Sequence, residues 1–135
     1  NDFVDFVENL ALKNNVLITT GIIDFDLIQN LKIKFFQKKT DNIYLKNYSN
    51  TSVYFIYMPT FNDIESLLRN AKILITCHGA VTHVANSFNV KIVDIIEKNR
   101  KVFYQHYTSY LKKYNPIYRA KFDILKDDLL DIIRE

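Results

Sequence analysis

The segment Thr76–Asn86 holds the side chains best suited to chemistry, because His78, Thr82 and His83 surround a glycine, Gly79. Apolar spacing predicts a strand before Gly79 and a helix after it. The first turn of a helix presents unpaired backbone N–H groups and a partial positive charge, and phosphates bind there readily. No carboxylate in or just before this turn would repel an anion. The segment therefore predicts an anion site, and a nucleotide diphosphate would suit its geometry.

Metal binding and covalent catalysis fit this segment less well. His78 and His83 are poorly spaced as metal ligands across a turn, and neither has an Asp or Glu beside it, so we predict no metal and no cofactor. Cys77 could supply a thiol nucleophile, but its place at the end of an apolar strand favours inert packing. The chain has only two glycines, Gly21 and Gly79, which excludes the usual dinucleotide and P-loop fingerprints.

Both glycines follow short runs of apolar and β-branched residues, Val16–Thr20 and Ile73–Thr76. Runs of this kind that lead into helices are typical of a parallel α/β sheet. Ligands of such sheets bind outside the carboxyl ends of the strands, where glycine permits sharp turns and close approach. Thr20 and Gly21 are therefore predicted to line the same cleft as the segment around Gly79.

The remaining pattern predicts elements that alternate between strand and helix. Predicted strands cover residues 15–20, 43–45, 53–57, 73–76 and 90–96, and residues 117–122 are expected to be extended. Predicted helices cover residues 2–13, 80–88, 102–114 and 127–134, and two more begin at Asp24 and at Asn62 or Asp63, while Pro116 is expected to end the helix before it. In the helix after Gly79, the residues expected to face the sheet are Val81, Val84, Ala85 and Phe88, and those expected to point away are Thr82, His83 and Asn86. Together these elements predict one three-layer α/β/α domain over residues 1–135, with a mostly parallel sheet of four to six strands.

Composition narrows the classes of protein. The net charge is +3 in 135 residues, and the lysines are mostly interleaved with acids, which favours a solvated surface over a nucleic-acid face. One cysteine excludes an internal disulfide framework and a multi-cysteine zinc site. No apolar run is long enough to span a bilayer and no signal peptide is recognised, so we expect a cytoplasmic protein. An amphipathic helix begins directly after Asn1 without a start signal, so we expect the C-terminal piece of a longer chain.

The stretch Ile64–Ala85 resembles the donor-domain signature of GT-B glycosyltransferases, most closely the heptosyltransferase-like group. The shared features are a leucine-containing helix, a buried strand, and a glycine loop with a histidine that leads into a small helix. The resemblance implies a Rossmann-like domain that binds a nucleotide-diphosphate sugar without a metal, for transfer to a cell-surface glycan or lipopolysaccharide acceptor. It also implies that the acceptor-binding half and the catalytic base lie in an N-terminal domain of the same chain, and it allows peripheral association with the inner face of a membrane.

Under this resemblance, the diphosphate contacts are Thr20, Gly21, His78, Gly79, Ala80, Val81, Thr82 and His83. His78, Thr82 or His83 would offset the charge that develops on the leaving diphosphate. The turn at Met58 and Pro59 would border the base, and the residues that would contact the sugar or the second phosphate are Glu97, Lys98 and Arg100. Two alternatives stay open: a non-catalytic binding or regulatory module, and a sugar-phosphate isomerase or epimerase. The second ranks lowest because no paired carboxylates are recognised for proton transfer.

Overall fold

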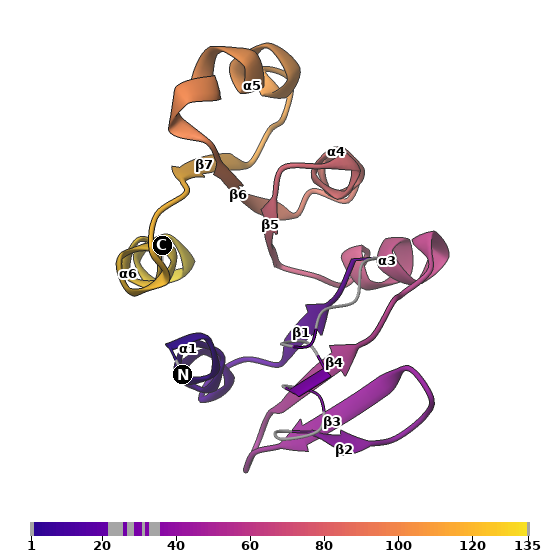
Figure 1. Cartoon of the computed structure of the whole chain (residues 1–135). Coiled ribbons are helices and arrows are strands. Elements are labelled where there is room, and N and C mark those ends of the chain that lie inside the picture. Colours follow the sequence, from indigo (N-terminus) through magenta and orange to yellow (C-terminus); the bar gives the residue numbers. More distant parts are fainter. Residues whose placement is uncertain (1, 22–25, 27–28, 31, 33–35, 135) are drawn as a thin grey trace. The chain divides into compact units, whose positions relative to one another are not determined.

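A computed structural model describes residues 2–21, 26, 29–30, 32 and 36–134 of the chain. The chain divides into two compact units, Asn1–Phe61 and Asn62–Glu135, each with its own β-sheet. The units are described separately below, with the element labels of Figure 1.

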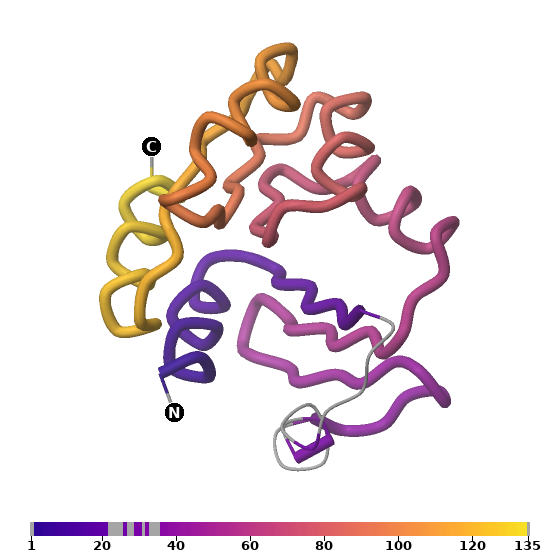
Figure 2. Tube along the Cα trace, turned by 45° about the horizontal axis from the view of Figure 1, so that its top comes forward, coloured from indigo at the N-terminus to yellow at the C-terminus, as the bar shows by residue number. Residues whose placement is uncertain are grey.

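The first unit is a mixed sheet with strand order β1-β4-β3-β2 and a helix, α1 (Asp2–Ala11). Its strands are β1 (Val16–Thr19), β2 (Gln37–Lys38), β3 (Ile43–Asn47) and β4 (Ser52–Ile56). β1 is parallel to β4, whereas β3 is antiparallel to both β4 and β2. The four residues between β3 and β4 are too few for a parallel crossover, so these strands form a hairpin, which Figure 2 shows in purple. α1 buries Phe6, Val7 and Ala11, and β4 buries Val53 and Phe55.

The second unit contains a three-stranded parallel sheet with order β5-β6-β7. Its elements are α3 (Phe61–Leu68), β5 (Ile73–Cys77), α4 (Ala80–Asn86), β6 (Lys91–Ile96), the 3-10 turn η1 (Lys98–Arg100), α5 (Lys101–Thr108), β7 (Tyr114–Tyr118) and α6 (Phe122–Arg134). The first crossover runs through α4 and the second through η1 and α5. Both advance in the same direction across the sheet, and such crossovers are almost always right-handed, which places α4 and α5 on one face.

The central strand β6 shows how the two faces of this sheet differ. Lys91 donates from Nζ to the carbonyl of Ile132 in α6, 2.6 Å away. The next residue, Ile92, is completely buried in a cluster with Leu68, Ala85 and Val90. Successive side chains of a strand alternate between faces, so Asp94 shares the face of Ile92 rather than that of Lys91. This places a carboxylate on the side where α4 packs.

The α/β class is confirmed, as are the strands expected at residues 15–20, 53–57, 73–76 and 90–96. The expected single, mostly parallel sheet is instead two sheets among the described residues, and the β3–β4 hairpin makes the first of them mixed. The helix expected from Asp24 falls largely outside the described residues. The Rossmann-like three-layer arrangement and the single domain over residues 1–135 stay predictions.

Two boundaries near the C-terminus were predicted wrongly. The helix expected over residues 102–114 ends at Thr108, and Pro116 lies inside β7 instead of ending that helix. Proline is tolerated there because β7 is an edge strand, in which not every N–H group must be paired. The last helix begins at Phe122, five residues before the predicted start at Asp127.

Candidate functional site

The candidate site lies where β5 and β6 approach their carboxyl ends. β5 ends at Cys77, His78 and Gly79 form the connection, and α4 begins at Ala80. In the parallel register, Thr76 of β5 lies opposite Asp94 of β6. The loop that follows Thr76 therefore passes over the face from which the Asp94 side chain projects.

Asp94 joins His78 to Tyr114 through a single carboxylate oxygen. The Nδ1 atom of His78 is 2.6 Å from Oδ2 of Asp94, and the Tyr114 hydroxyl donates to the same oxygen at 2.8 Å. Asp94 has no exposed surface, and 16% of the His78 side chain is exposed. Burial, and then the hydrogen bond to Asp94, raise the pKa of the Tyr114 hydroxyl well above its usual value of 10.0. Tyr114 therefore acts as a neutral donor that helps to hold the carboxylate in place.

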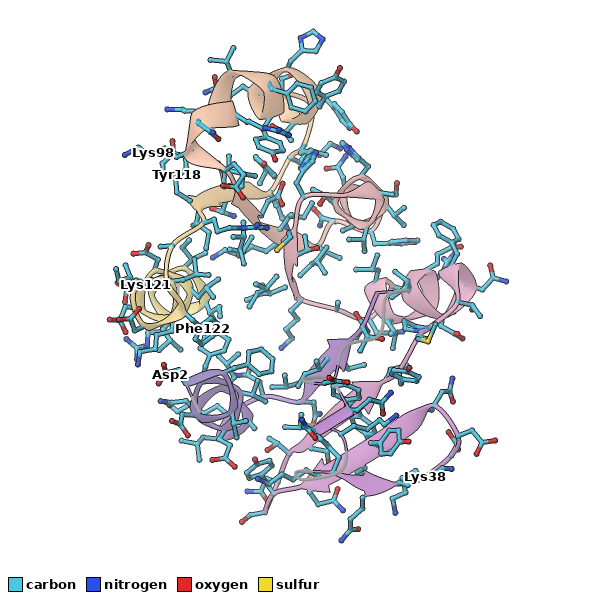
Figure 3. All side chains as sticks on the ribbon, viewed as in Figure 1. Asp2, Lys38, Lys98, Tyr118, Lys121 and Phe122 are labelled. Atoms are coloured by element: carbon cyan, nitrogen blue, oxygen red, sulfur yellow. The ribbon has the colours of Figure 1, made fainter. Side chains whose placement is uncertain are left out.

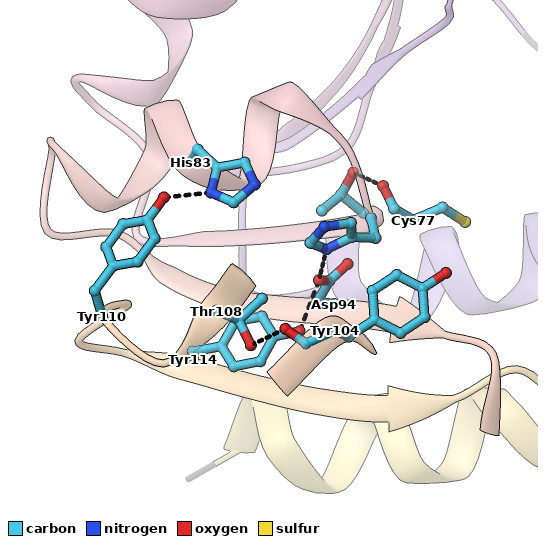
Figure 4. Close-up of polar contacts among 9 residues, drawn as sticks. Cys77, His83, Asp94, Tyr104, Thr108, Tyr110 and Tyr114 are labelled. Carbon is cyan, nitrogen blue, oxygen red and sulfur yellow. Dashed lines mark hydrogen bonds and ion pairs between the residues drawn. The ribbon is translucent and has the colours of Figure 1, made fainter. Parts of the chain in front are cut away.

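A second imidazole lies close to the first. The Nδ1 atom of His83 is 2.5 Å from the Tyr110 hydroxyl, a contact visible in Figure 4. The rings of His78 and His83 meet edge to face with their centres 5.5 Å apart, and the ring of Tyr104 lies 4.8 Å from that of His78. Each imidazole thus has one nitrogen bound within the protein, which leaves Nε2 as the nitrogen for other partners.

The contact between His78 and Asp94 is suited to fix the tautomer and the orientation of the His78 imidazole. A carboxylate accepts hydrogen bonds, so Nδ1 of His78 carries the proton and Nε2 carries the lone pair in the neutral ring. This is how a buried aspartate orients a histidine that acts as an acid or base. His78 can therefore accept a proton at Nε2 or, once protonated, donate from Nε2 to an anion.

Thr82 does not point away from the sheet as predicted. It is completely buried, and its Oγ1 has no hydrogen-bond partner among the described residues. Thr82 and Ala85 are both buried at the spacing of one helical turn, so α4 is covered over a wider face than the apolar stripe indicated. The Thr82 hydroxyl is consequently out of reach of a ligand in solution. Oδ1 of Asp94 is likewise buried and unpartnered within the described part of the chain.

Gly79 directly follows His78, and its backbone adopts a conformation that any residue type can adopt. Gly79 has φ 179°, which is extended, and neither described glycine has a positive φ. A Cβ atom built on Gly79 would meet only the Cys77 carbonyl oxygen, at 3.8 Å. The sharp turn expected at Gly79 therefore does not depend on a left-handed backbone. Ala80 and Val81, the other predicted contacts, form the first turn of α4.

Cys77 is exposed, which contradicts the expectation that it packs inertly at the end of a buried strand. The reason is positional, since Cys77 is the last residue of β5 and β5 is at the edge of its sheet. In the part of the chain that the structure describes, no group of three His, Cys, Asp or Glu side chains could hold a metal ion.

Four predicted contacts belong to the first unit. The backbone N–H of Met58 donates to Oγ1 of Thr20 at 2.8 Å, so the end of β1 and the turn after β4 are joined. Met58 has φ 47°, and a Cβ atom on Gly21 would meet nothing within 4 Å. Thr20, Gly21 and the turn at Met58 and Pro59 thus form one neighbourhood of that unit.

The charged residues after β6 are engaged with the end of β7. Glu97 forms an ion pair with Arg119 at 3.0 Å. The ammonium of Lys98 lies 5.8 Å from the centre of the Tyr118 ring, and Figure 3 shows these two side chains beside each other. Arg100 is exposed.

Sequence reasoning missed four residues that build this site: Tyr104, Tyr110, Tyr114 and, above all, Asp94. Asp94 carried a detectable signal, because an aspartate inside the apolar run Val90–Ile96 occupies a strand with no other acid. A buried charge requires a partner, and His78 in the parallel neighbour strand's loop was the nearest candidate. The tyrosines gave no such signal. The chain has nine tyrosines, and the three-dimensional path of the chain decides which of them contacts a histidine.

Comparisons with known proteins identify no relative of the chain. No family model matches the chain, and neither a curated protein nor a solved structure does. Among the described residues, no helix has the length and apolar character needed to cross a membrane.

Proposed function

We propose that residues 1–135 belong to the donor-binding half of a metal-independent glycosyltransferase and that the second unit holds a nucleotide-diphosphate sugar at the carboxyl ends of β5 and β6. The observation that carries the proposal is the buried contact between Asp94 and His78, 2.6 Å long, beside the start of α4. A buried carboxylate that orients a partly exposed imidazole is costly to maintain, and such arrangements cluster at functional sites.

The location supports a phosphorylated ligand. In open α/β sheets, ligands bind outside the carboxyl ends of parallel strands. His78 and His83 each retain Nε2, and the backbone of Gly79 and Ala80 begins the helix between them. Imidazolium groups beside free N–H groups provide the donors that phosphate oxygens require.

The chemistry assigned to His78 concerns the leaving group. In glycosyl transfer, an acceptor oxygen bonds to the anomeric carbon while the bond from that carbon to the phosphate oxygen breaks and its electron pair stays on the diphosphate. Once protonated, His78 offsets the growing negative charge through a hydrogen bond from Nε2, and His83 adds a second donor. The base that takes the acceptor's proton is assigned to none of residues 1–135.

Other expected features belong to the same proposal. The fold would be Rossmann-like and three-layered, of heptosyltransferase-like type, and the enzyme would act in the cytoplasm on a glycan or lipid-linked acceptor with the help of an N-terminal domain. Lys98 and Arg100 would contact the sugar or the second phosphate, with Glu97 beside them. Thr20, Gly21, Met58 and Pro59 belong to the first unit, and their contacts with the ligand stay predictions.

A thermal-shift titration with ADP, UDP, GDP and CMP tests the proposal, because a ligand that binds only the folded state raises the melting temperature. We expect one nucleotide diphosphate to raise it, His78→Gln to reduce the shift, and His106→Gln to leave it unchanged. His106 is a matched control because it is the third histidine of the chain and is exposed on α5. A shift that is equal in both variants, or no shift with any nucleotide, would contradict the proposal.

A further inference from the structure

α5 turns an unusual face to solvent. Val102, Phe103 and Tyr107 are 80%, 55% and 48% exposed, and Tyr110, just after the helix, is 58% exposed. These residues and His106 fall within one side of the helix, whereas Tyr104 and Thr108 occupy the inward side and Thr108 is buried. Contacts between the Phe103 and Tyr107 rings, 4.8 Å apart, make the exposed side a continuous aromatic surface.

Positive charge lies at both ends of this surface. Between Glu97 and Asp123 the sequence contains no acid, and its basic residues are Lys98, Arg100, Lys101, Lys112, Lys113, Arg119 and Lys121. The whole chain carries only +3, so the rest of it is net negative. Glu97, the acid nearest to the surface in sequence, is already paired with Arg119. This segment is therefore an exception to the interleaving of lysines and acids in most of the chain.

We infer that this surface, formed by Val102, Phe103, Tyr107 and Tyr110 with Lys101 and Lys112 at its ends, binds the surface of an anionic lipid bilayer. Aromatic side chains flanked by lysine and arginine suit the boundary between headgroups and acyl chains, where the rings enter and the cations meet acidic headgroups. Single-stranded nucleic acid is the weaker match. It requires bases stacked along a basic groove, and here the cations flank an aliphatic and aromatic surface instead.

This inference does not depend on the ligand of His78. It nevertheless has a consequence for that site, because Tyr104 links the surface to His78 and Tyr110 links it to His83. A ligand at the imidazoles would thus be held close to the membrane, where a lipid-linked acceptor would be found.

Vesicle sedimentation of the full chain tests the inference. We expect binding to phosphatidylcholine vesicles that contain phosphatidylglycerol, little binding to pure phosphatidylcholine, and weaker binding at high salt. Phe103→Ser should lower the affinity about tenfold because a buried aromatic ring is lost from the bilayer. Phe61→Ser is the matched control, since Phe61 is 62% exposed at the start of α3, and it should leave the affinity unchanged.

A charge pair gives an independent test with the same vesicles. Lys101→Ala combined with Lys112→Ala should lower the affinity about 25-fold, since each basic residue near an anionic surface contributes about fivefold. Lys13→Ala combined with Lys39→Ala, two exposed lysines of the first unit, should have no effect. The inference is overturned if anionic vesicles are not bound, if both pairs act equally, or if a single-stranded oligonucleotide binds while vesicles do not.

Discussion

His78 and Asp94 form a pair in which Nδ1 of the partly exposed imidazole lies 2.6 Å from an oxygen of the fully buried carboxylate. The loop after β5 supplies the histidine, and the central strand β6 supplies the aspartate. Because parallel pairing aligns Thr76 with Asp94, the two side chains meet only when β5 and β6 pair in this register. The orientation of the candidate site thus depends directly on the sheet.

The tautomer of His78 should change when Asp94 is replaced by asparagine. The carboxylate holds the proton on Nδ1, whereas an asparagine amide can donate to Nδ1 and move the proton to Nε2. Nitrogen-15 NMR of the imidazoles should show the Nδ1–H form for neutral His78 in the wild type and the Nε2–H form in Asp94→Asn. His106, which lies on α5, should give the same spectrum in both proteins. An Nε2–H form in the wild type would contradict the proposed pair.

Tyr114→Phe should destabilise the protein by about 2 kcal/mol, because it removes a hydrogen bond to a buried carboxylate. The variant should also lose less stability in alkali. The raised pKa of Tyr114 means that the folded state keeps its proton after the unfolded chain has lost it, so wild-type stability falls as the pH rises above about 10. One such proton contributes a slope of about 1.4 kcal/mol per pH unit.

Urea unfolding between neutral pH and pH about 11 measures both effects of Tyr114→Phe. Tyr107→Phe is the control, because Tyr107 is 48% exposed on α5. Equal alkaline slopes in the two variants would show that the Tyr114 proton does not distinguish the folded state.

Thr82→Val should raise the stability by about 1 kcal/mol, because it removes a buried hydroxyl that has no partner within the described residues. Thr108→Val should do the opposite, since the buried Thr108 hydroxyl donates to the Tyr104 carbonyl at 2.9 Å. Chemical denaturation of both variants makes the comparison. If Thr82→Val costs as much as Thr108→Val, the Thr82 hydroxyl has a partner and the account of α4 is wrong.

Glu8→Gln should flatten the acid side of the stability profile. A hydrogen bond from Lys46, 2.5 Å long, lowers the pKa of Glu8 below its usual 4.5. The carboxylate therefore stabilises the folded state above about pH 4.5, and this contribution is lost as the pH falls through its lower folded pKa. Because both side chains are partly exposed, the effect should stay below about 1 kcal/mol and shrink in about 1 M salt. A difference that persists unchanged at high salt would rule out this ion pair as its source.

Much of the second unit could be predicted from local pattern. The apolar runs before Gly79 and over Val90–Ile96 identified β5 and β6, and the helical spacing between them identified α4. The parallel arrangement of β5 and β6 followed from this alternation of strand and helix. What failed depended on distant partners: Thr82 is buried because α4 is covered on a second side, which helical spacing alone does not indicate.

The first unit and β7 show a different limit. Ile43–Leu45 and Val53–Tyr57 were both expected to be strands, but only the short connection between them makes β3 antiparallel to β4. Pro116 weakened the strand pattern of β7 in the sequence. In the structure, pairing with β6 outweighs this low strand propensity. That Asp94 is the partner of His78 could have been predicted from the sequence. The hydrogen bond between Asp94 and Tyr114 could not, because it depends on where β7 lies in the sheet.

Imidazole NMR during titration with the nucleotide diphosphate that raises the melting temperature most tests the central claim directly. The chain has three histidines, and single His→Gln variants assign their signals. The account predicts that the Nε2 signals of His78 and His83 shift together and saturate, while those of His106 stay in place. Saturable binding that leaves His78 and His83 unchanged, or that shifts all three histidines alike, would contradict a diphosphate site at the ends of β5 and β6.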